Sequence, residues 1–408
     1  MAKLSIRDVD LTGKRVLIRV DFNVPLSKDT GEGISILDDT RIRETVPTIE
    51  YALRRKARVI LCSHLGRPKG KVTPALSLRP VVDRLRELLD GVLGQDENVG
   101  FAPDCVGELA TELVTGLEPG QTLLLENLRF HPEEETNDPN FAKQLAALCD
   151  IYVNDAFGSA HRAHASTEGI THFVKQSAAG LLMESELQHL GKALNTPDKP
   201  FVAIIGGAKV SDKIGVIESL MDKASAILIG GGMAYTFLRA QGQQTGKSLV
   251  ESDKVEVARA ALEMATQKGV RFLLPIDHVL ADRFDAHATT STFEGTGAFP
   301  ADLMALDIGP KTVALFSAEI GGARTVLWNG PMGVFEFPAF AIGTNAIAKA
   351  VASNVDATTI VGGGDSVSAI HKSGFAEKIT HISTGGGASL EFLEGKALPG
   401  VEALTDKA

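Results

Sequence analysis

Residues 201–213 read Phe-Val-Ala-Ile-Ile-Gly-Gly-Ala-Lys-Val-Ser-Asp-Lys, a continuous apolar run followed directly by two glycines. An unbroken apolar run of this length is typical of a strand buried on both faces of a parallel sheet. Glycines after such a strand let the backbone turn into a helix and approach a ligand closely. The stretch therefore predicts an α/β fold with a ligand-binding loop at the end of a strand.

The same pattern recurs along the chain. The predicted strands are 16–20, 59–63, 122–125 and 151–154 in the first half, and 201–205, 226–229, 271–274, 325–328, 358–361 and 381–383 in the second. The predicted helices between them are 46–56, 78–89, 141–148, 253–268 and 340–354. Thr45 is expected to cap the first helix, with Pro47 in its first turn. Apolar strands alternating with helices predict parallel sheets covered on both faces.

The length of 408 residues suits two or three domains. A charged amphipathic stretch at 181–194 predicts a connecting helix, and Asn-Thr-Pro-Asp-Lys-Pro follows it as a linker. We therefore expect two Rossmann-like three-layer domains with parallel sheets, facing across a cleft. Their expected limits are 1–180 and 199–395, with the helix and linker at 181–198 and an irregular tail at 396–408 that returns to the N-terminal domain.

The bulk composition excludes several classes of protein. The net charge is −10 and the isoelectric point is near 5.5, so the chain lacks the basic footprint of a nucleic-acid binder. Cys62, Cys105 and Cys149 are isolated from one another and are interpreted as core residues in a reducing compartment. We see no signal peptide and no apolar run long enough to span a membrane, and expect a cytoplasmic location.

Four glycine clusters each follow a predicted strand directly, and they lie at 206–207, 230–232, 362–364 and 385–387. Any one of them could be only a tight turn. Four at the same kind of position favour phosphate binding at helix N-termini, where free N–H groups gather. None matches GxxxxGK[ST], and none gives GxGxxG with an acidic residue about 20 positions later.

Three charged residues adjoin these clusters. Lys209 and Lys213 are four apart, and on the first turns of a helix they would share one face and could hold separate phosphates. The alternative is an ordinary solvated helix face. Asp365 follows three glycines and is either a helix cap or a ligand of Mg²⁺. The metal role is favoured because a nucleotide must bring a cation to this acidic chain.

The first half places basic and polar residues after its predicted strands. They are Asp21, Asn23, Arg41, His64, Arg67, Arg129, His161 and Arg162. A single arginine is usually a surface ion pair of little energy, and a single histidine is usually a partly buried ring. Their joint placement predicts a pocket for a small polyanion, because arginine binds carboxylate and phosphate through a planar fork.

Eight blocks together resemble the phosphoglycerate kinase family. They are RVDFNVP (19–25), SHLGRP (63–68), LLLENLRF (123–130), NDAFGSAHRAHAST (154–167), IIGGAKVSDKI (204–214), WNGPMGVFE (328–336), GGGDS (362–366) and STGGGASLEFLEGK (383–396). The resemblance runs from about residue 4 to about residue 400, and so many blocks in this order are very specific.

The resemblance implies Mg²⁺-dependent, reversible phosphoryl transfer between 1,3-bisphosphoglycerate and ADP, giving 3-phosphoglycerate and ATP. It assigns phosphoglycerate to the N-terminal domain, at Asp21, Asn23, Arg41, His64, Leu65, Gly66, Arg67, Arg129 and Arg162. It assigns the nucleotide to the C-terminal domain, at Gly207, Lys209, Lys213, Gly232, Ala305, Leu306, Asn329, Glu336, Gly363, Gly364, Asp365 and Ser366. Asp365 would lie at Mg²⁺, and the catalytic groups would be Arg41, Lys213 and Gly386.

The sequence departs from the family pattern at two places. The loop GGGDT of the family is GGGDS here, which keeps a hydroxyl at Ser366. A family Gly-Leu-Asp reads Ala305-Leu306-Asp307, which could shift the adenine pocket.

The implied mechanism needs no general base, because the accepting carboxylate is already ionised at pH 7. Positioning and charge stabilisation would supply the catalysis, and the two domains would close to bring the ligands together. The expected partners are the two small-molecule substrates, with no nucleic acid and no membrane, and the expected state is a monomer.

Three other functions are weighed against this one. A nucleotide-binding module without activity would not need Arg41 or Arg129. A dinucleotide oxidoreductase would need the missing GxGxxG fingerprint. A structural or interaction protein would leave the glycine loops unexplained.

Overall fold

Two compact units make up the chain. The computed structural model describes residues 2–27, 34–93, 99–295 and 297–407. Unit 1 contains the chain up to Leu187 together with the segment from Ala397, and unit 2 contains Gln188–Lys396. The chain passes from unit 1 to unit 2 within α6 (Leu181–Asn195). The helix predicted at 181–194 is therefore present and belongs to both units.

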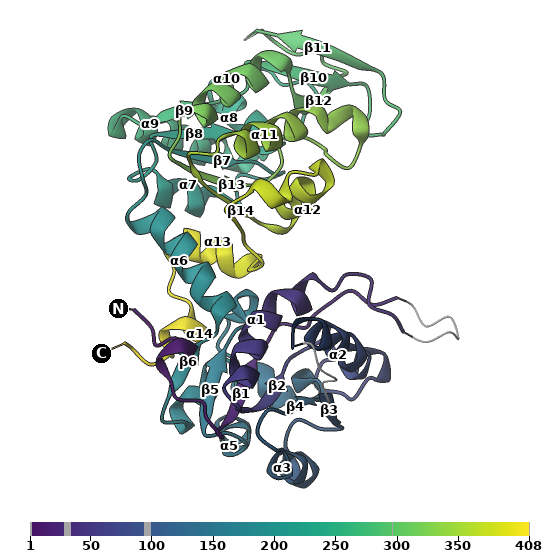
Figure 1. Ribbon diagram of the computed structural model, residues 1–408. Coiled ribbons are helices and arrows are strands. Elements are labelled where there is room, and N and C mark those ends of the chain that lie inside the picture. The colour runs from purple at the N-terminus through teal and green to yellow at the C-terminus, as the bar shows by residue number, and fades with distance from the viewer. Residues whose placement is uncertain (1, 28–33, 94–98, 296, 408) are drawn as a thin grey trace. The chain divides into compact units, whose positions relative to one another are not determined.

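A parallel six-stranded sheet forms the middle of unit 1 (Figure 1). Its strands are β1 (Arg15–Arg19), β2 (Arg58–Cys62), β3 (Val99–Ala102), β4 (Thr122–Leu125), β5 (Ile151–Asn154) and β6 (Ser177–Ala179). They lie in the order β3-β4-β2-β1-β5-β6. In the pairing of β1 with β2, Arg19 lies opposite Cys62. The loops that follow these two strands therefore begin side by side at one edge of the sheet.

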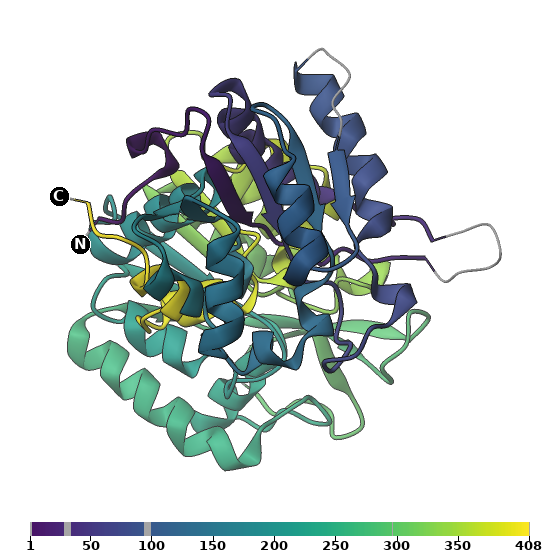
Figure 2. The ribbon, with the colours of Figure 1, turned by 90° about the horizontal axis from the view of Figure 1, so that it is seen from below.

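Helices cover both faces of this sheet (Figure 2). They are α1 (Thr40–Arg54), α2 (Arg79–Leu93), α3 (Gly107–Thr115), α4 (Pro132–Glu135) and α5 (Pro139–Ala147). Val16 and Ile18 of β1 belong to one buried core with Ile42 of α1 and Leu85 of α2. Leu17 between them is also fully buried, and strand geometry places it on the opposite face. Burial on both faces explains the unbroken apolar pattern.

Unit 2 repeats this architecture around a second parallel sheet. Its strands are β7 (Phe201–Ile205), β8 (Ala226–Ile229), β9 (Arg271–Leu273), β13 (Thr325–Asn329), β14 (Thr358–Gly362) and β15 (His381–Ile382), in the order β15-β14-β13-β7-β8-β9. Asn329 lies opposite Ile205 on one side and Gly362 on the other. This register places Asn329 between two of the glycine loops.

The helices of unit 2 follow their strands as predicted. They are α7 (Ile214–Leu220), α8 (Met233–Ala240), α9 (Val255–Lys268), α10 (Pro310–Gly321), α11 (Ile342–Ser353), α12 (Gly364–Ser373) and α13 (Gly387–Leu393). Helices α10, α11 and α12 pack side by side, and α8 packs beside α9. Trp328 of β13 lies in a buried core with Phe316 of α10 and Ile347 of α11. The predicted α/β class with two parallel sheets is confirmed.

A small antiparallel sheet in unit 2 was not predicted. Its strands are β10 (Asp277–Ala281), β11 (Thr290–Glu294) and β12 (Met304–Ile308), with β10 in the middle. Strand β11 reads Thr-Ser-Thr-Phe-Glu and is largely exposed, so it lacks the apolar run that marked the other strands. Strand β12 contains Ala305 and Leu306, two of the residues predicted to bind the nucleotide.

The structure corrects two predicted helix features. Helix α1 begins at Thr40, after Asp39, and not after Thr45. Thr45 is fully buried inside the helix, and its hydroxyl donates to the carbonyl of Ile42 at 2.9 Å. A threonine hydroxyl can cap a helix or bond back to its own helix, and here it does the second. Pro47 consequently lies within the helix and not in its first turn.

The segment from Ala397 is more ordered than predicted. It contains α14 (Pro399–Glu402), whereas the sequence indicated an irregular tail. Within unit 1, the N–H of Gly400 donates to Ala160 O at 2.9 Å, and Asn154 Nδ2 donates to Gly400 O at 3.1 Å. Near the N-terminus, Lys3 forms an ion pair with Asp406 at 2.9 Å. Backbone and ionic contacts thus hold this segment against unit 1.

Candidate active site in two parts

Five of the predicted phosphoglycerate residues form one connected cluster in unit 1. Arg41 Nη1 lies 3.2 Å from Asp21 Oδ1 and donates to the carbonyl of Asn23 at 3.1 Å. Asn23 Oδ1 accepts the N–H of Gly66 at 2.9 Å. Arg129, which follows β4, donates from Nη1 to the carbonyl of Gly66 at 2.9 Å. Segments that follow three different strands therefore meet at the carboxyl edge of the sheet, as the sequence predicted.

The cluster continues through His64, two residues after the end of β2. The ring is only 5% exposed, and Nδ1 lies 3.1 Å from Nη2 of Arg19. Arg19 is the last residue of β1 and is fully buried. It was not among the predicted site residues.

The electrostatic field of this region is positive. Burial, together with the charges of Arg19, Arg129 and Arg41, holds the pKa of His64 well below its ordinary value. Burial and neighbouring arginines lower the pKa of His164 to about 4. A field that opposes protonation of two histidines favours the binding of an anion.

The remaining predicted residues of unit 1, Leu65, Arg67 and Arg162, differ in burial. Arg67 and Arg162 are exposed, and Arg162 Nε donates to His161 Nε2 at 3.2 Å. Leu65 is buried, and its N–H donates to Asn127 Oδ1 at 3.2 Å. The two arginine side chains are therefore exposed and can reach a ligand, whereas Leu65 anchors the loop that contains His64 and Gly66.

Unit 2 contains a cavity of about 480 Å³, which is the size of a typical small-molecule site. It is lined by Gly207, Ala208, Gly231, Gly232, Tyr235, Lys247, Leu249, Phe284, Met304, Ala305, Leu306, Pro331, Gly333, Val334, Glu336 and Asp365. Six of the twelve predicted nucleotide residues belong to this lining: Gly207, Gly232, Ala305, Leu306, Glu336 and Asp365. The other six, Lys209, Lys213, Asn329, Gly363, Gly364 and Ser366, do not line the cavity.

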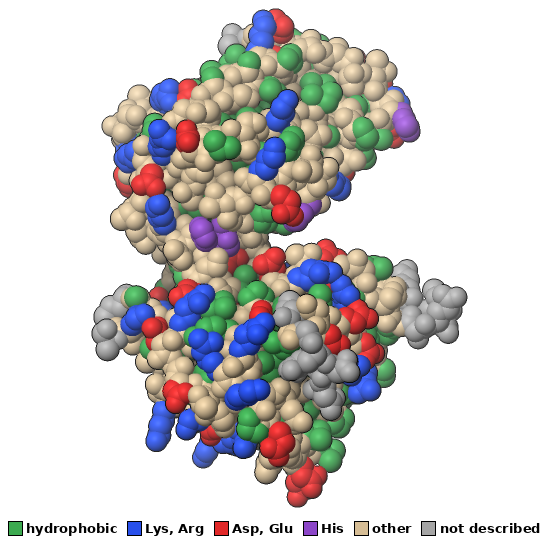
Figure 3. Space-filling view, in the orientation of Figure 1, with side chains coloured by type: hydrophobic (Ala, Val, Ile, Leu, Met, Phe, Trp, Pro, Cys, Tyr) green, Lys and Arg blue, Asp and Glu red, His purple; other side chains and the backbone are tan. Residues whose placement is uncertain are grey.

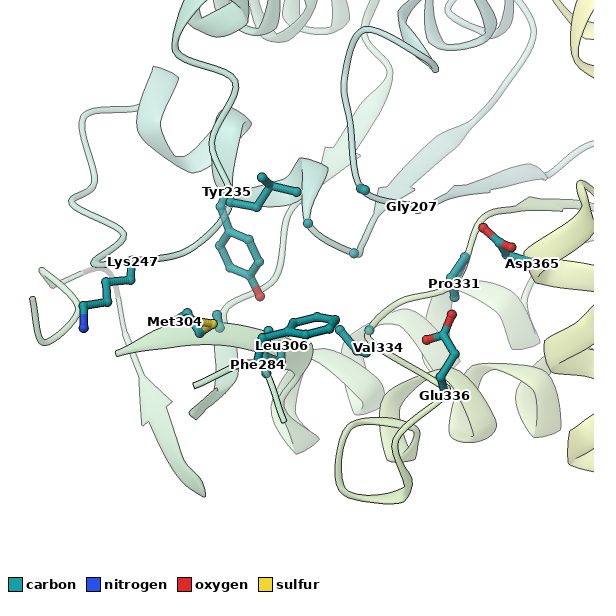
Figure 4. Close-up of a pocket in the computed structure, with 16 residues that line it drawn as sticks. Gly207, Tyr235, Lys247, Phe284, Met304, Leu306, Pro331, Val334, Glu336 and Asp365 are labelled. Carbon is teal, nitrogen blue, oxygen red and sulfur yellow. The ribbon is translucent and has the colours of Figure 1, made fainter. Parts of the chain in front are cut away.

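The two ends of the cavity differ in chemistry (Figure 4). The carboxylates of Glu336 and Asp365 lie together beside Pro331, and Gly207 lies near this end. Toward the other end the wall is mainly apolar, with Leu306 and the exposed ring of Phe284, and Lys247 lies at its edge. An apolar slot that leads to glycine N–H groups and carboxylates suits a ligand with a flat ring at one end and phosphates at the other.

Lys213 lies close to the polar end of the cavity. Its Nζ donates to Asn329 Oδ1 at 2.5 Å, and Asn329 Nδ2 donates to the carbonyl of Gly362 at 2.9 Å. Burial lowers the pKa of Lys213, while the charges of Asp212 and Asp365 oppose that shift. Asn329, fully buried, thus fixes the lysine and the Gly363 loop at the same time.

The predicted placement of the lysine pair on a helix is wrong. Helix α7 begins at Ile214, so Lys209 and Lys213 lie in the loop before it. Gly206 and Gly207 shape this loop, because the N–H of Gly206 donates to Asn329 O and that of Gly207 to Pro331 O. These backbone hydrogen bonds hold the loop after β7 against the end of β13 and the segment that follows it. Lys209 and Lys213 belong to this loop.

The other three glycine loops lead into helix N-termini, as predicted, with Gly232 directly before α8. Gly363 has φ of +92° directly before α12, and Gly386 has φ of +52° directly before α13. Positive φ of this size favours glycine. Ser366 is fully buried, and its hydroxyl accepts the N–H of Gly330 at 2.5 Å. Its side chain therefore ties α12 to the loop after β13.

Sequence reasoning missed two residues around the cavity. Tyr235 directs its hydroxyl into the cavity (Figure 4), and no described residue hydrogen-bonds this group. Asp307 lies beneath the wall, where Oδ2 accepts the N–H of Gly343 at 2.7 Å and Oδ1 that of Ile308 at 2.9 Å. Burial raises the pKa of Asp307 to about 7. Site residues are predicted from the sequence by their position directly after a strand, and neither Tyr235 nor Asp307 has that position.

These observations define an α/β protein with a cluster of arginine and histidine side chains in one unit and a cavity of about 480 Å³ in the other. The phosphoglycerate kinase family matches residues 6–396. The chain is 72% identical to the phosphoglycerate kinase of Acidobacterium capsulatum and 68% identical to that of Koribacter versatilis, over the whole of each chain. The chain belongs to the phosphoglycerate kinase family, and it is a kinase.

Solved structures agree with this assignment. The phosphoglycerate kinase of Coxiella burnetii has a TM-score of 0.88 at 42% identity, and that of Pyrococcus horikoshii has a TM-score of 0.82 at 33% identity. Each comparison covers 98% of both chains. Within the described residues, no helix combines the length and apolar character needed to cross a membrane.

Proposed function

We propose that the cavity of unit 2 binds ATP or ADP with its base at the apolar end and its phosphates toward Gly207 and Asp365. The observation that carries this proposal is the cavity itself, whose apolar and polar ends match the two ends of a nucleotide. Glu336 would accept a hydrogen bond from the ribose. Lys213, Lys209 and the N–H groups before α12 would hold phosphate oxygens.

We propose that the cluster of unit 1 binds 3-phosphoglycerate through Arg41, Arg67, Arg129, Arg162 and His64. The charges of Arg19, Arg129 and Arg41, which add to burial in lowering the pKa of His64, support this placement because the same charges attract an anion. Asp21, Asn23, Leu65 and Gly66 would shape the pocket and orient the substrate.

In the ATP-consuming direction, a carboxylate oxygen of phosphoglycerate would attack the γ-phosphorus and ADP would leave. The acceptor is already ionised, so its attack needs no general base. Arg41 and Lys213 would stabilise the charge of the transferring group, with the N–H groups around Gly386. Direct transfer requires the two ligands to meet, and we propose that the units close on each other during turnover.

Asp365 lies at the polar end of the cavity, near Glu336, and its charge acts on Lys213. One carboxylate combined with substrate phosphates is a common way to hold Mg²⁺. The donor set therefore fits, and bound Mg²⁺ would neutralise phosphate charge there. Lys213 and the glycine N–H groups would orient the same phosphates.

We also propose a cytoplasmic monomer that does not bind nucleic acid. On the face drawn in Figure 3, basic and acidic side chains are interspersed over each unit, which supports the last point. This surface has no single-sign field of the kind that attracts a polyanion.

An assay of ADP formation tests the proposal. The protein is mixed with Mg-ATP, with and without 3-phosphoglycerate. Acid-dependent turnover is the expected result. Nucleotide binding by calorimetry without turnover would leave the unit 2 placement standing and contradict the substrate placement in unit 1.

A further inference from the structure

Arg19 is a fully buried arginine that was not among the predicted site residues. Its Nε donates to Ser166 Oγ at 2.9 Å, its Nη1 donates to the carbonyl of Val20, and its Nη2 lies 3.1 Å from His64 Nδ1. All three nitrogens of the guanidinium are therefore engaged within unit 1. A buried charge with this many partners has a fixed geometry.

The contact with Arg19 decides which nitrogen of His64 carries the proton. A guanidinium has only donors, so Nδ1 of His64 must accept and cannot carry hydrogen. Burial and the nearby arginines hold the pKa of His64 well below its ordinary value, which keeps the ring neutral at pH 7. A neutral imidazole carries one proton. That proton must then lie on Nε2.

Nε2 of His64 is available to a ligand. No described residue hydrogen-bonds it, and it is not among the buried polar atoms that lack a partner. Gly66, two residues further along, belongs to the cluster described above and bonds to Asn23 and Arg129. The free N–H therefore belongs to the part of unit 1 that carries the anion-binding residues.

A buried carboxylate supports Arg19 from the other side. Glu134 is fully buried and accepts the hydroxyl of Ser166 at 2.6 Å and the N–H of Ser166 at 2.9 Å. Burial raises the pKa of Glu134, and the charge of Arg19 opposes that shift. The chain of contacts Glu134–Ser166–Arg19–His64 thus runs from the core to the cluster.

We propose that Arg19 is a positioning residue that holds His64 in the tautomer with its proton on Nε2, so that the ring donates a hydrogen bond to the anionic substrate of unit 1. The opposite tautomer would turn a lone pair toward the anion and repel it. This role rests on the proposed placement of phosphoglycerate, but the tautomer itself is a property of the free protein. No proton is transferred in this role.

The tautomer is measured first, on the free protein. Long-range ¹H–¹⁵N spectra distinguish protonated from unprotonated ring nitrogens, and loss of one ring in His64→Gln assigns the signals. The wild type is expected to show a neutral His64 with its proton on Nε2 at pH 7. A proton on Nδ1, or an imidazolium, would overturn the proposal.

Arg19→Lys tests whether Arg19 fixes this state. One ammonium cannot bond Ser166, Val20 and His64 together, so both tautomers of His64 should be populated. Arg15→Lys is the matched control, because Arg15 begins the same strand and pairs with Asp150 at 2.8 Å away from His64. It should leave the Nε2 proton in place. An unchanged tautomer in a folded Arg19→Lys variant would contradict the positioning role.

A pair of substitutions at His64 tests the donor and does not depend on the folding of an Arg19 variant. The amide nitrogen of glutamine can replace Nε2, whereas that of asparagine lies near the position of Nδ1. The KM for 3-phosphoglycerate should rise at least about tenfold in His64→Asn, as for a lost bond to a charged group. It should rise about threefold or less in His64→Gln. The KM for ATP should change in neither.

Arg129→Lys separates this proposal from the placement on which it rests. If it raises the KM for 3-phosphoglycerate while the two His64 variants behave alike, the placement stands and the donor role is refuted. If none of the three changes this KM, the placement in unit 1 fails, and the donor role with it. Only a selective defect in His64→Asn, together with the Nε2 proton, supports the proposal.

Discussion

Gly206 provides a sharp test of how the glycine loops of unit 2 are built. A Cβ at this position would lie 2.1 Å from Pro331 O and 2.5 Å from Gly330 O, whereas real Cβ atoms essentially never approach within 3.0 Å. Both oxygens belong to the backbone, so no side-chain rotation relieves the contact. In Gly206→Ala, the segment after β13 must therefore move away from the loop after β7.

The size of the effect follows from these distances. Relief of the closer contact requires a shift of about 1 Å, and Asn329, which precedes Gly330, holds Lys213 at 2.5 Å. A misplacement of about 1 Å can lower the rate about 10²-fold. Overpacking typically costs about 1–3 kcal/mol of stability. We therefore expect kcat/KM for ATP to fall about 10²-fold, with a lower free energy of unfolding.

The assay is steady-state ADP formation, combined with urea unfolding of the same preparations. Gly321→Ala is the matched control, because an added Cβ there meets nothing within 4 Å. Gly321 ends α10, where alanine should leave kcat/KM unchanged and stabilise by at most about 1 kcal/mol. If Gly206→Ala kept kcat/KM within about threefold of the control, the close approach of the two loops would not matter for function.

Four further changes probe the rest of the molecule. Lys213→Ala should lower kcat about 10²–10³-fold, as for a lost donor to the transition state, and an unchanged kcat in steady-state assays would exclude that role. Arg67→Ala should mainly raise the KM for 3-phosphoglycerate. A change confined to the KM for ATP would show that Arg67 does not bind 3-phosphoglycerate. Tyr235→Phe should weaken ADP binding in calorimetry about 2–10-fold if its hydroxyl bonds the base, and leave inorganic triphosphate unaffected. Burial raises the pKa of Asp155 to about 6, so the contribution of this carboxyl to stability is full below pH 4 and is lost as the pH rises through 6. Asp155→Asn should therefore stabilise the protein by up to about 3 kcal/mol at pH 8 and have no such effect at pH 3.5. Urea unfolding at both pH values measures this difference.

The sequence predicted the parallel sheets because their strands are buried on both faces. Leu17 and Ile18 are both fully buried although they face opposite sides of β1, and such runs are visible without a structure. Strand β11 escaped notice because its side chains are mostly exposed and its alternation is weak. Helix α1 was placed too late because Thr45 has the side chain of a cap but bonds back inside its own helix.

The candidate site was predictable for a related reason. The carboxyl ends of parallel strands meet at one edge, so residues that follow different strands, such as Asp21, His64 and Arg129, come together. Arg19 could not be found in this way, because it lies within a strand and its neighbours are apolar. Tyr235 lies within α8, where an aromatic residue is usually part of the core.

Two of the missed residues, Arg19 and Asp307, lie beneath the candidate site, and this has a consequence for how variants should behave. Arg19 lies under His64, and Asp307 lies under the wall that contains Gly333, whose added Cβ would be 2.3 Å from Asp307 Oδ1. Each is buried beside a group of the candidate site. A surface contact such as Arg67 can be removed at little cost in stability, whereas removal of a buried support leaves polar partners unsatisfied. Loss of affinity accompanied by loss of stability should therefore distinguish the supports from the residues that bind the substrates directly.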